Sequence, residues 1–179
     1  LGVAALIIVL AVMNGFENEL RLRLTSITGH AFVSAEGGIA DWRPLRAELA
    51  GRPGITSAVP VVELEAVLSR GSELAGAIVT GTDPGLEPAD SPLRLGMRAG
   101  ALEDLRPGSR AVLLGDALAA RIGARVGDSV NLLVPTKARG RGLESRIRQF
   151  TVAGIFELGV KDHDGTRALV SLQDAADLG

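Results

Sequence analysis

The sequence predicts an α+β fold of two lobes, preceded by a hydrophobic helix. Short segments with alternating apolar and polar residues interrupt short segments with helical spacing, without the regular strand–helix–strand rhythm of a parallel α/β sheet. A stretch rich in Pro, Gly and Asp at residues 85–100 divides the chain into two parts. The 179 residues, 46% of them hydrophobic, are enough for one large domain or two small lobes.

Residues 1–13 (LGVAALIIVLAVM) form an unbroken apolar run. A helix needs about 20 apolar residues to cross a bilayer. We therefore expect this run to be the outer end of a transmembrane helix that leaves the membrane near Asn14. Two acid–base pairs spaced four residues apart, between positions 17 and 23, and an apolar stripe that continues to Ile27 extend this helix to residue 28. A buried core helix and the apolar part of a signal peptide are the alternatives.

The first lobe is expected to span residues 29–84 and to begin with a strand and a helix. Residues 30–35 (HAFVSA) predict a short strand with Phe32 facing inward. Asp41 is the expected N-cap of a helix over residues 42–50, in which a proline is tolerated in the first turn.

A β-hairpin is expected to complete this lobe. Residues 55–69 (ITSAVPVVELEAVLS) alternate so that one face is wholly apolar, and residues 74–80 form a second apolar strand after a turn at Gly71. A cluster of turn residues at 81–85 ends the lobe.

A second lobe is expected to follow at residues 85–134. Its predicted elements are a strand at 111–114, a helix at 116–122 ended by a glycine, and a strand at 129–134. Beyond it, the pattern predicts strands at 150–158 and 168–172 and a helix from residue 173.

The composition excludes several kinds of chemistry. The chain has no cysteine, which excludes disulfides, thiolate metal sites and a cysteine nucleophile. Its net charge of −2 argues against a general nucleic-acid binder. Neither a glycine-rich phosphate loop nor a G-x-S-x-G nucleophile motif is present. Lys161-Asp162-His163-Asp164 is better explained as a polar turn than as a metal site, because its carboxylates and imidazole cannot easily converge on one ion without distant ligands.

Positive charge is concentrated in one segment, residues 135–149 (PTKARGRGLESRIRQ). Five basic residues against one acid give this segment a formal charge of +4, so the rest of the chain carries −6. Arginine forks suit carboxylates and backbone carbonyls of a protein partner, although the segment is also compatible with an ordinary solvated loop. The candidate partner-binding residues are Pro135, Lys137, Arg139, Arg141, Arg146 and Arg148.

Three motifs in order resemble one family along essentially the whole chain. They are VMNGF at residues 12–16, the spaced pattern G-x-x-L-A-x-x-I-G-x-x-V-G-D-x-V at 115–130, and FTVAGIFELG at 150–159. Together they are similar to the lipoprotein-releasing ABC transporter permeases of Gram-negative bacteria, the LolC/LolE type. His163 departs from the pattern, because the family often has an aromatic residue there.

This resemblance implies a mixed two-lobe extracytoplasmic permease domain that follows the first transmembrane helix, with the second lobe inserted and residues 150–179 returning to the first. The protein would lie in the bacterial inner membrane with this domain in the periplasm. It would be a non-catalytic transporter subunit without a cofactor, because ATP is used by a separate ATPase dimer. The other implied partners are a paralogous or identical permease, a lipoprotein substrate and a periplasmic lipoprotein carrier.

In the resembled family the segment matching residues 135–149 projects as a β-hairpin that grips the carrier, with a basic residue at the position of Arg148. Two alternatives stay open at this point. One is a related permease domain, of the macrolide-efflux type or another. The other is a soluble hydrolase whose site uses His163 with Asp162 or Asp164.

Overall fold

A computed structural model describes residues 2–3, 6–7, 9–16, 31–35, 37–137, 143–159 and 164–179. It divides into two compact units, Leu1–Ile39 and Ala40–Gly179. We describe each unit by itself.

In the first unit, residues 9–16 are helical and expose their large apolar side chains. Among the described residues, no helix combines the length and the hydrophobicity that crossing a membrane requires. The expected strand at 30–35 is wrong, because residues 31–35 pair with no strand in the described chain. Phe32, expected to face inward, is 66% exposed.

Seven strands of the second unit form one sheet within the described residues. Their bounds are β1 Val62–Arg70, β2 Glu73–Thr82, β3 Met97–Ala99, β4 Ala111–Gly115, β5 Ser129–Lys137, β6 Leu143–Phe156 and β7 Arg167–Ser171. The predicted β1–β2 hairpin is confirmed, with Arg70 paired to Glu73. The strand predicted over 55–69 begins only at Val62, because the β2 ladder ends there, opposite Gly81.

The helices of this unit are short. They are α2 Arg43–Ala50, α3 Pro92–Leu95, α4 Asp116–Arg121 and α6 Leu172–Leu178, with a 3₁₀ turn, η1, at Leu102–Asp104. Trp42, not the expected Asp41, is the N-cap of α2, and it makes no side-chain capping bond. Its ring instead lies under the guanidinium of Arg43, 5.1 Å from the ring centroid.

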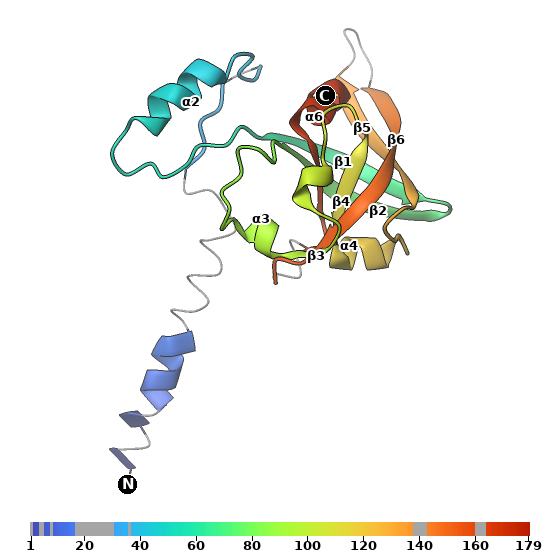
Figure 1. Cartoon of the computed structure of the whole chain (residues 1–179). Coiled ribbons are helices and arrows are strands. Elements are labelled where there is room, and N and C mark those ends of the chain that lie inside the picture. The colour runs from blue at the N-terminus through green and yellow to red at the C-terminus, as the bar shows by residue number, and fades with distance from the viewer. Residues whose placement is uncertain are drawn as a thin grey trace. The chain divides into compact units, whose positions relative to one another are not determined.

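The strand pairings close into a barrel. The order β6-β4-β7-β2-β1-β5 returns to its start because β5 also pairs with β6, and β3 is added outside this ring beside β6. Figure 1 shows β6 running past β4 and beside β5. A closed ring leaves its six strands without a free edge.

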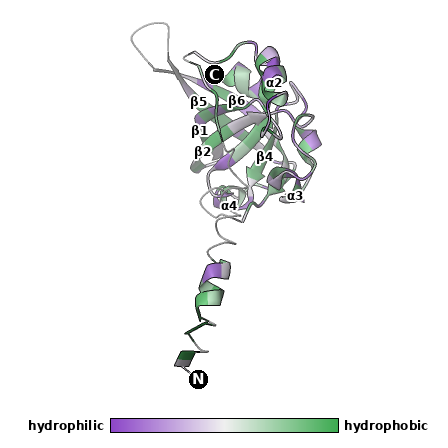
Figure 2. Ribbon diagram, turned by 90° about the vertical axis from the view of Figure 1, so that its left-hand side faces the viewer, coloured by the Kyte–Doolittle hydropathy of each residue, from purple (hydrophilic) through white to green (hydrophobic). Residues whose placement is uncertain are grey.

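The interior of the barrel is the main core. Alternate residues of every ring strand belong to this core. Figure 2 shows hydrophobic residues along these strands. Leu68, Leu132 and Val152, from three different strands, are each 0% exposed. Helix α4 contributes Leu118 at one end of the barrel, and α6 contributes Leu178 at the other. The face predicted to be wholly apolar in β1 is thus confirmed as the buried face.

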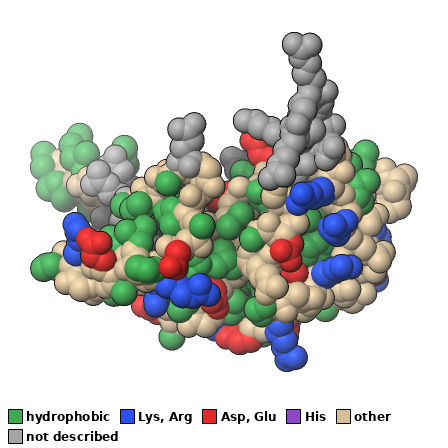
Figure 3. Space-filling model, turned by 90° about the horizontal axis from the view of Figure 1, so that it is seen from above, with side chains coloured by type: hydrophobic (Ala, Val, Ile, Leu, Met, Phe, Trp, Pro, Cys, Tyr) green, Lys and Arg blue, Asp and Glu red, His purple; other side chains and the backbone are tan. Residues whose placement is uncertain are grey.

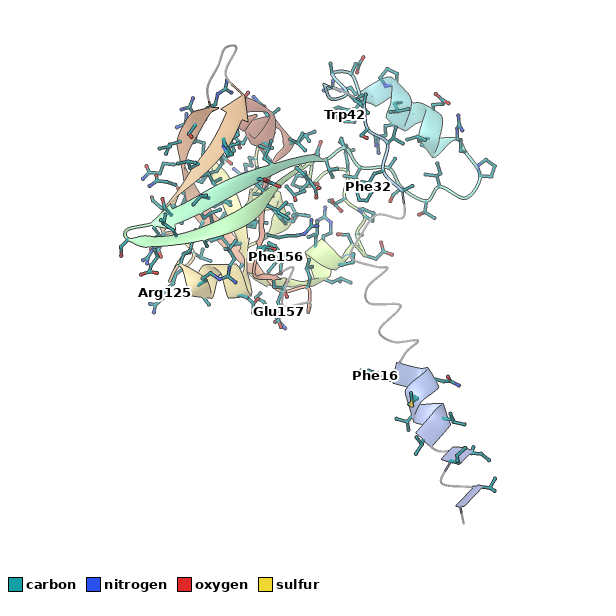
Figure 4. The ribbon with its side chains drawn as sticks, turned by 180° about the vertical axis from the view of Figure 1, so that it is seen from behind. Phe16, Phe32, Trp42, Arg125, Phe156 and Glu157 are labelled. Carbon is teal, nitrogen blue, oxygen red and sulfur yellow. The ribbon has the colours of Figure 1, made fainter. Side chains whose placement is uncertain are left out.

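A second cluster covers part of the outside. Leu113 and Phe156 (Figure 4) point outward from β4 and β6 and pack under Leu102 and Leu105 of the segment around η1. Strands from the ranges 85–134 and 150–179 share one sheet with β1 and β2. The expected two lobes therefore do not correspond to a division of the sheet.

Arg94 ties this outer layer together. Its guanidinium donates to the carbonyl oxygens of Pro84 (2.5 Å) and Pro88 (3.2 Å) and pairs with Glu103. The hydrogen bond from Arg94 holds the pKa of the Glu103 carboxyl below its usual range. One side chain thus connects Pro84, Pro88 and Glu103, three points of the segment that precedes β4.

The Arg94–Glu103 pair predicts a small pH dependence. A carboxyl whose pKa is lowered on folding stabilises the protein above its unfolded pKa, about 4.3, and this contribution is lost as the pH falls through the lowered folded value. Urea unfolding at neutral pH and near pH 3 should therefore show a smaller acid-induced loss of stability in Glu103→Gln than in the wild type. Equal losses in the two proteins would mean that the pair does not contribute.

Candidate functional site

The base of the β5–β6 hairpin carries Arg146 and Arg148. These are the two basic residues of segment 135–149 whose side chains the structure describes. Arg148 is paired with Leu132 and Arg146 with Val134. Both arginines lie on the face of β6 that further along buries Phe150 and Val152, yet both are exposed. This part of β6 therefore presents guanidinium groups where the barrel interior ends.

The other predicted partner-binding residues are described only in part. Pro135 is exposed in β5 opposite Ser145. Lys137 is the last residue of β5, paired with Leu143. Its side chain, together with Arg139 and Arg141, lies outside the described residues, so the projection of the hairpin stays a prediction.

Helix α6 lies next to this base. The Nη1 atom of Arg146 donates to the carbonyl oxygen of Asp177, at 3.3 Å, in the last turn of α6. A cation at this end of a helix compensates its unpaired carbonyl groups. The contact brings the hairpin base and the C-terminal helix together, although they are far apart in the sequence.

A pocket of about 330 Å³ opens between β6 and α6. It is lined by Arg110, Arg148, Phe150, Asp174, Asp177 and Leu178. Figure 3 views this end of the barrel and shows basic, acidic and hydrophobic side chains close together on it. The pocket is therefore amphipathic, with both signs of charge at its rim.

Arg110 was not among the predicted site residues. It precedes β4 with a φ of 53°, and is the one non-glycine residue with positive φ in the described part of the chain. Its carbonyl oxygen accepts a hydrogen bond from the amide of Thr151 in β6, at 2.9 Å. No sequence signal marks this residue beyond the neighbouring Gly108-Ser109 turn.

Asp164, a candidate residue of the hydrolase alternative, has a structural role. Its side chain is 2% exposed. Its two carboxylate oxygens accept hydrogen bonds from the amides of Leu158 (2.8 Å) and Gly159 (3.1 Å). Asp162 and His163 lie outside the described residues. Within the part of the chain that is described, no cluster of His, Asp and Glu could hold a metal ion.

Comparison with known proteins places the chain among transport proteins. A family model, the MacB-like periplasmic core domain, matches residues 1–178. The chain is 39% identical over 176 residues to the lipoprotein-releasing system transmembrane protein LolC of Xylella fastidiosa (strain Temecula1), an alignment that covers 97% of this chain and 42% of that protein. It is 38% identical over 177 residues to LolC of Neisseria meningitidis serogroup B, covering 98% of this chain and 43% of the relative.

More distant similarities were also found. The chain is 31% identical over 140 residues to the lipoprotein-releasing system transmembrane protein LolE of Haemophilus influenzae, covering 75% of this chain and 33% of that protein. A solved structure, the extracellular domain of the noncanonical ABC-type transporter YknZ from Gram-positive bacteria, matches with a TM-score of 0.49 and 16% identity over 75% of this chain and 64% of that one. The chain thus spans about two fifths of the length of the first two relatives.

Proposed function

The chain belongs to the family of MacB-like periplasmic core domains, in its LolC/LolE type, and we propose that it releases lipoproteins from the inner membrane and passes them to a periplasmic carrier. It is a domain of an ABC transporter permease. The cargo is proposed from the names of the LolC relatives, which describe a lipoprotein-releasing system.

The proposed mechanism is mechanical. Residues 1–28 would connect the domain to the membrane as the end of a transmembrane helix, and a separate ATPase dimer would supply the energy. A barrel with a close-packed interior moves as a rigid body, so motion of the membrane helices would reposition the hairpin. The carboxylate of Asp164 accepts two backbone hydrogen bonds, a structural role that lends no support to the hydrolase alternative.

The observation that carries the carrier-binding step is the pair of exposed arginines at the hairpin base. Neither Arg146 nor Arg148 forms an ion pair with any described residue. They belong to a segment of charge +4 in a chain whose remainder carries −6. A segment with this excess of positive charge suits an acidic partner surface and mainly raises the rate of association.

The test is charge reversal in the full-length permease. We expect Arg146→Glu/Arg148→Glu to slow capture of the purified carrier at low salt by roughly tenfold or more. Stability should fall only modestly, because both side chains are exposed: Arg148 has no carboxylate partner among the described residues, and Arg146 loses one exposed hydrogen bond to the end of α6. Arg121→Glu is the control, since this exposed arginine lies on α4 at the opposite end of the barrel.

Stopped-flow or surface-plasmon measurements of the association rate, at two salt concentrations, would decide the matter. Equal rates for the wild type and the double reversal at low salt would reject carrier binding at the hairpin base. A slowing as large in Arg121→Glu would point to a general charge effect.

A further inference from the structure

The β5–β6 hairpin belongs to the closed barrel over part of its length. In the described chain β1 pairs with β5 over the three residues Val67–Ser69, and Leu133 is the last residue of β5 in this ladder. Strands β5 and β6 stay paired with each other as far as Lys137 and Leu143. Beyond Leu133 the hairpin is therefore a ribbon of two strands, and such a ribbon is marginally stable by itself.

The barrel interior ends close to the same point. Val134 is 2% exposed, whereas Pro135 and Ser145, which lie opposite each other, are exposed. Proline has no amide hydrogen with which to pair a further strand, and within sheets it is typical of edges. The ribbon thus leaves both the closed sheet and the core near Val134.

Helix α6, by contrast, is held closely by β7 and β2. Strand β7 ends at Ser171 and α6 begins at the next residue, so no loop separates them. The hydroxyl of Ser171 accepts a hydrogen bond from the amide of Asp174, at 3.1 Å, and donates one to its Oδ2 atom, at 2.7 Å. A Cβ atom at Gly81 of β2 would overlap with the Cβ of Ala175, so the helix lies directly on this strand. Helix α6 is therefore fixed to the body of the barrel.

A weak contact connects this fixed helix with the ribbon. The pocket of about 330 Å³ lies between β6 and α6 and leaves room between them. Among the described residues, the bond from Arg146 to the carbonyl oxygen of Asp177 is the one hydrogen bond that joins the ribbon to another element. It is 3.3 Å long, and the arginine side chain that donates it is exposed, so its net contribution to stability is small.

We infer that the ribbon, residues 134–137 and 143–146, is an arm that pivots near Val134, and that Arg146 is the latch that holds it to α6. With the latch closed, the arm follows the barrel; with the latch open, the arm changes its angle to the barrel. The latch itself does not depend on the proposed function, but one consequence rests on it. A carboxylate of a docking partner would open the latch, because a guanidinium binds a carboxylate more strongly than a neutral carbonyl oxygen.

Hydrogen exchange in the full-length permease, measured without any carrier, tests the latch. We expect Arg146→Ala to lower the protection factors of the amides in residues 143–147 roughly threefold, while protection in β2 and β7 stays at the wild-type level. Arg148→Ala is the matched control and should leave all of these amides unchanged. Arg148 is an exposed arginine on the same face of β6, but it donates to the carbonyl oxygen of the neighbouring Ile147 instead of to α6.

Any of three results would overturn the latch. Unchanged protection in Arg146→Ala would show that the bond to α6 does not restrain the arm. An equal loss of protection in Arg148→Ala would assign the effect to the lost positive charge. A loss that extends to β2 and β7 would mean that the whole barrel is destabilised. Because no carrier is present, none of these results bears on carrier binding, which the charge-reversal measurement tests separately.

Discussion

Replacing Gly115 by alanine is expected to destabilise the domain by about 3 kcal/mol or more. A Cβ atom at this position would lie 2.8 Å from the carbonyl carbon and 2.9 Å from the Cα of Asp164, and closer still to its carbonyl oxygen. These are backbone atoms, which cannot turn away as a flexible side chain can. The φ of −60° at Gly115 suits any residue, so the cost comes from space alone.

Gly76→Ala provides the matched comparison. Gly76 also lies in a strand, but nothing lies within 4 Å of the Cβ that alanine would add. Its stability should stay within about 0.5 kcal/mol of the wild type or rise slightly. Urea denaturation of both variants measures the difference. Equal stabilities would show that the chain near Asp164 yields easily, contrary to the close packing described above.

Asp164→Ala is expected to cost about 2–4 kcal/mol of unfolding free energy. The substitution removes a buried carboxylate that accepts hydrogen bonds from two amides, those of Leu158 and Gly159. In the alanine variant both amides lose their acceptor. A buried donor without an acceptor is destabilising, and the alanine side chain cannot compensate for this loss. Chemical denaturation followed by circular dichroism measures the loss.

Asp164→Asn refines this measurement. Asparagine keeps one acceptor oxygen but places an amide group against the second backbone donor, so its loss should be substantial as well. An alanine variant as stable as the wild type would mean that water replaces the carboxylate. Because Gly115 and Asp164 are in contact, the effects of combined substitutions should not be additive.

The pattern of alternation predicted which face of β1 is buried, but it did not predict a closed barrel. The apolar face of β1, which includes Leu64, Ala66 and Leu68, points inward as expected. Alternation says which face is buried, but it does not say which strands are neighbours. The ring closes because β6 pairs with both β4 and β5. No local sequence pattern indicates which strands will pair in this way.

Local helix signals were similarly incomplete. Asp41 has the side chain that helix starts prefer, yet the N-cap of α2 is the next residue, Trp42, and the helix begins at Arg43. The segment around Phe32 has the alternation of apolar and polar residues that is typical of a strand. In the described chain, however, it pairs with no other strand. A strand is stabilised by its neighbours, so sequence alone overpredicted it.

Charge counting found part of the candidate site. The excess of arginine in residues 135–149 led directly to Arg146 and Arg148. The sequence did not indicate Arg110 as a site residue, because a left-handed backbone is not expected of arginine. The pocket also needs α6, which reaches the hairpin only through the fold of the whole barrel.

The 14-residue strand β6 has a mechanical consequence. It extends from the hairpin base, where it pairs with β5, to the outer cluster, where it pairs with β4 and β3. A partner that pulls on the hairpin along this strand would load many ladder hydrogen bonds at once, in shear, instead of opening them one by one. We therefore expect the domain to resist tension along this direction.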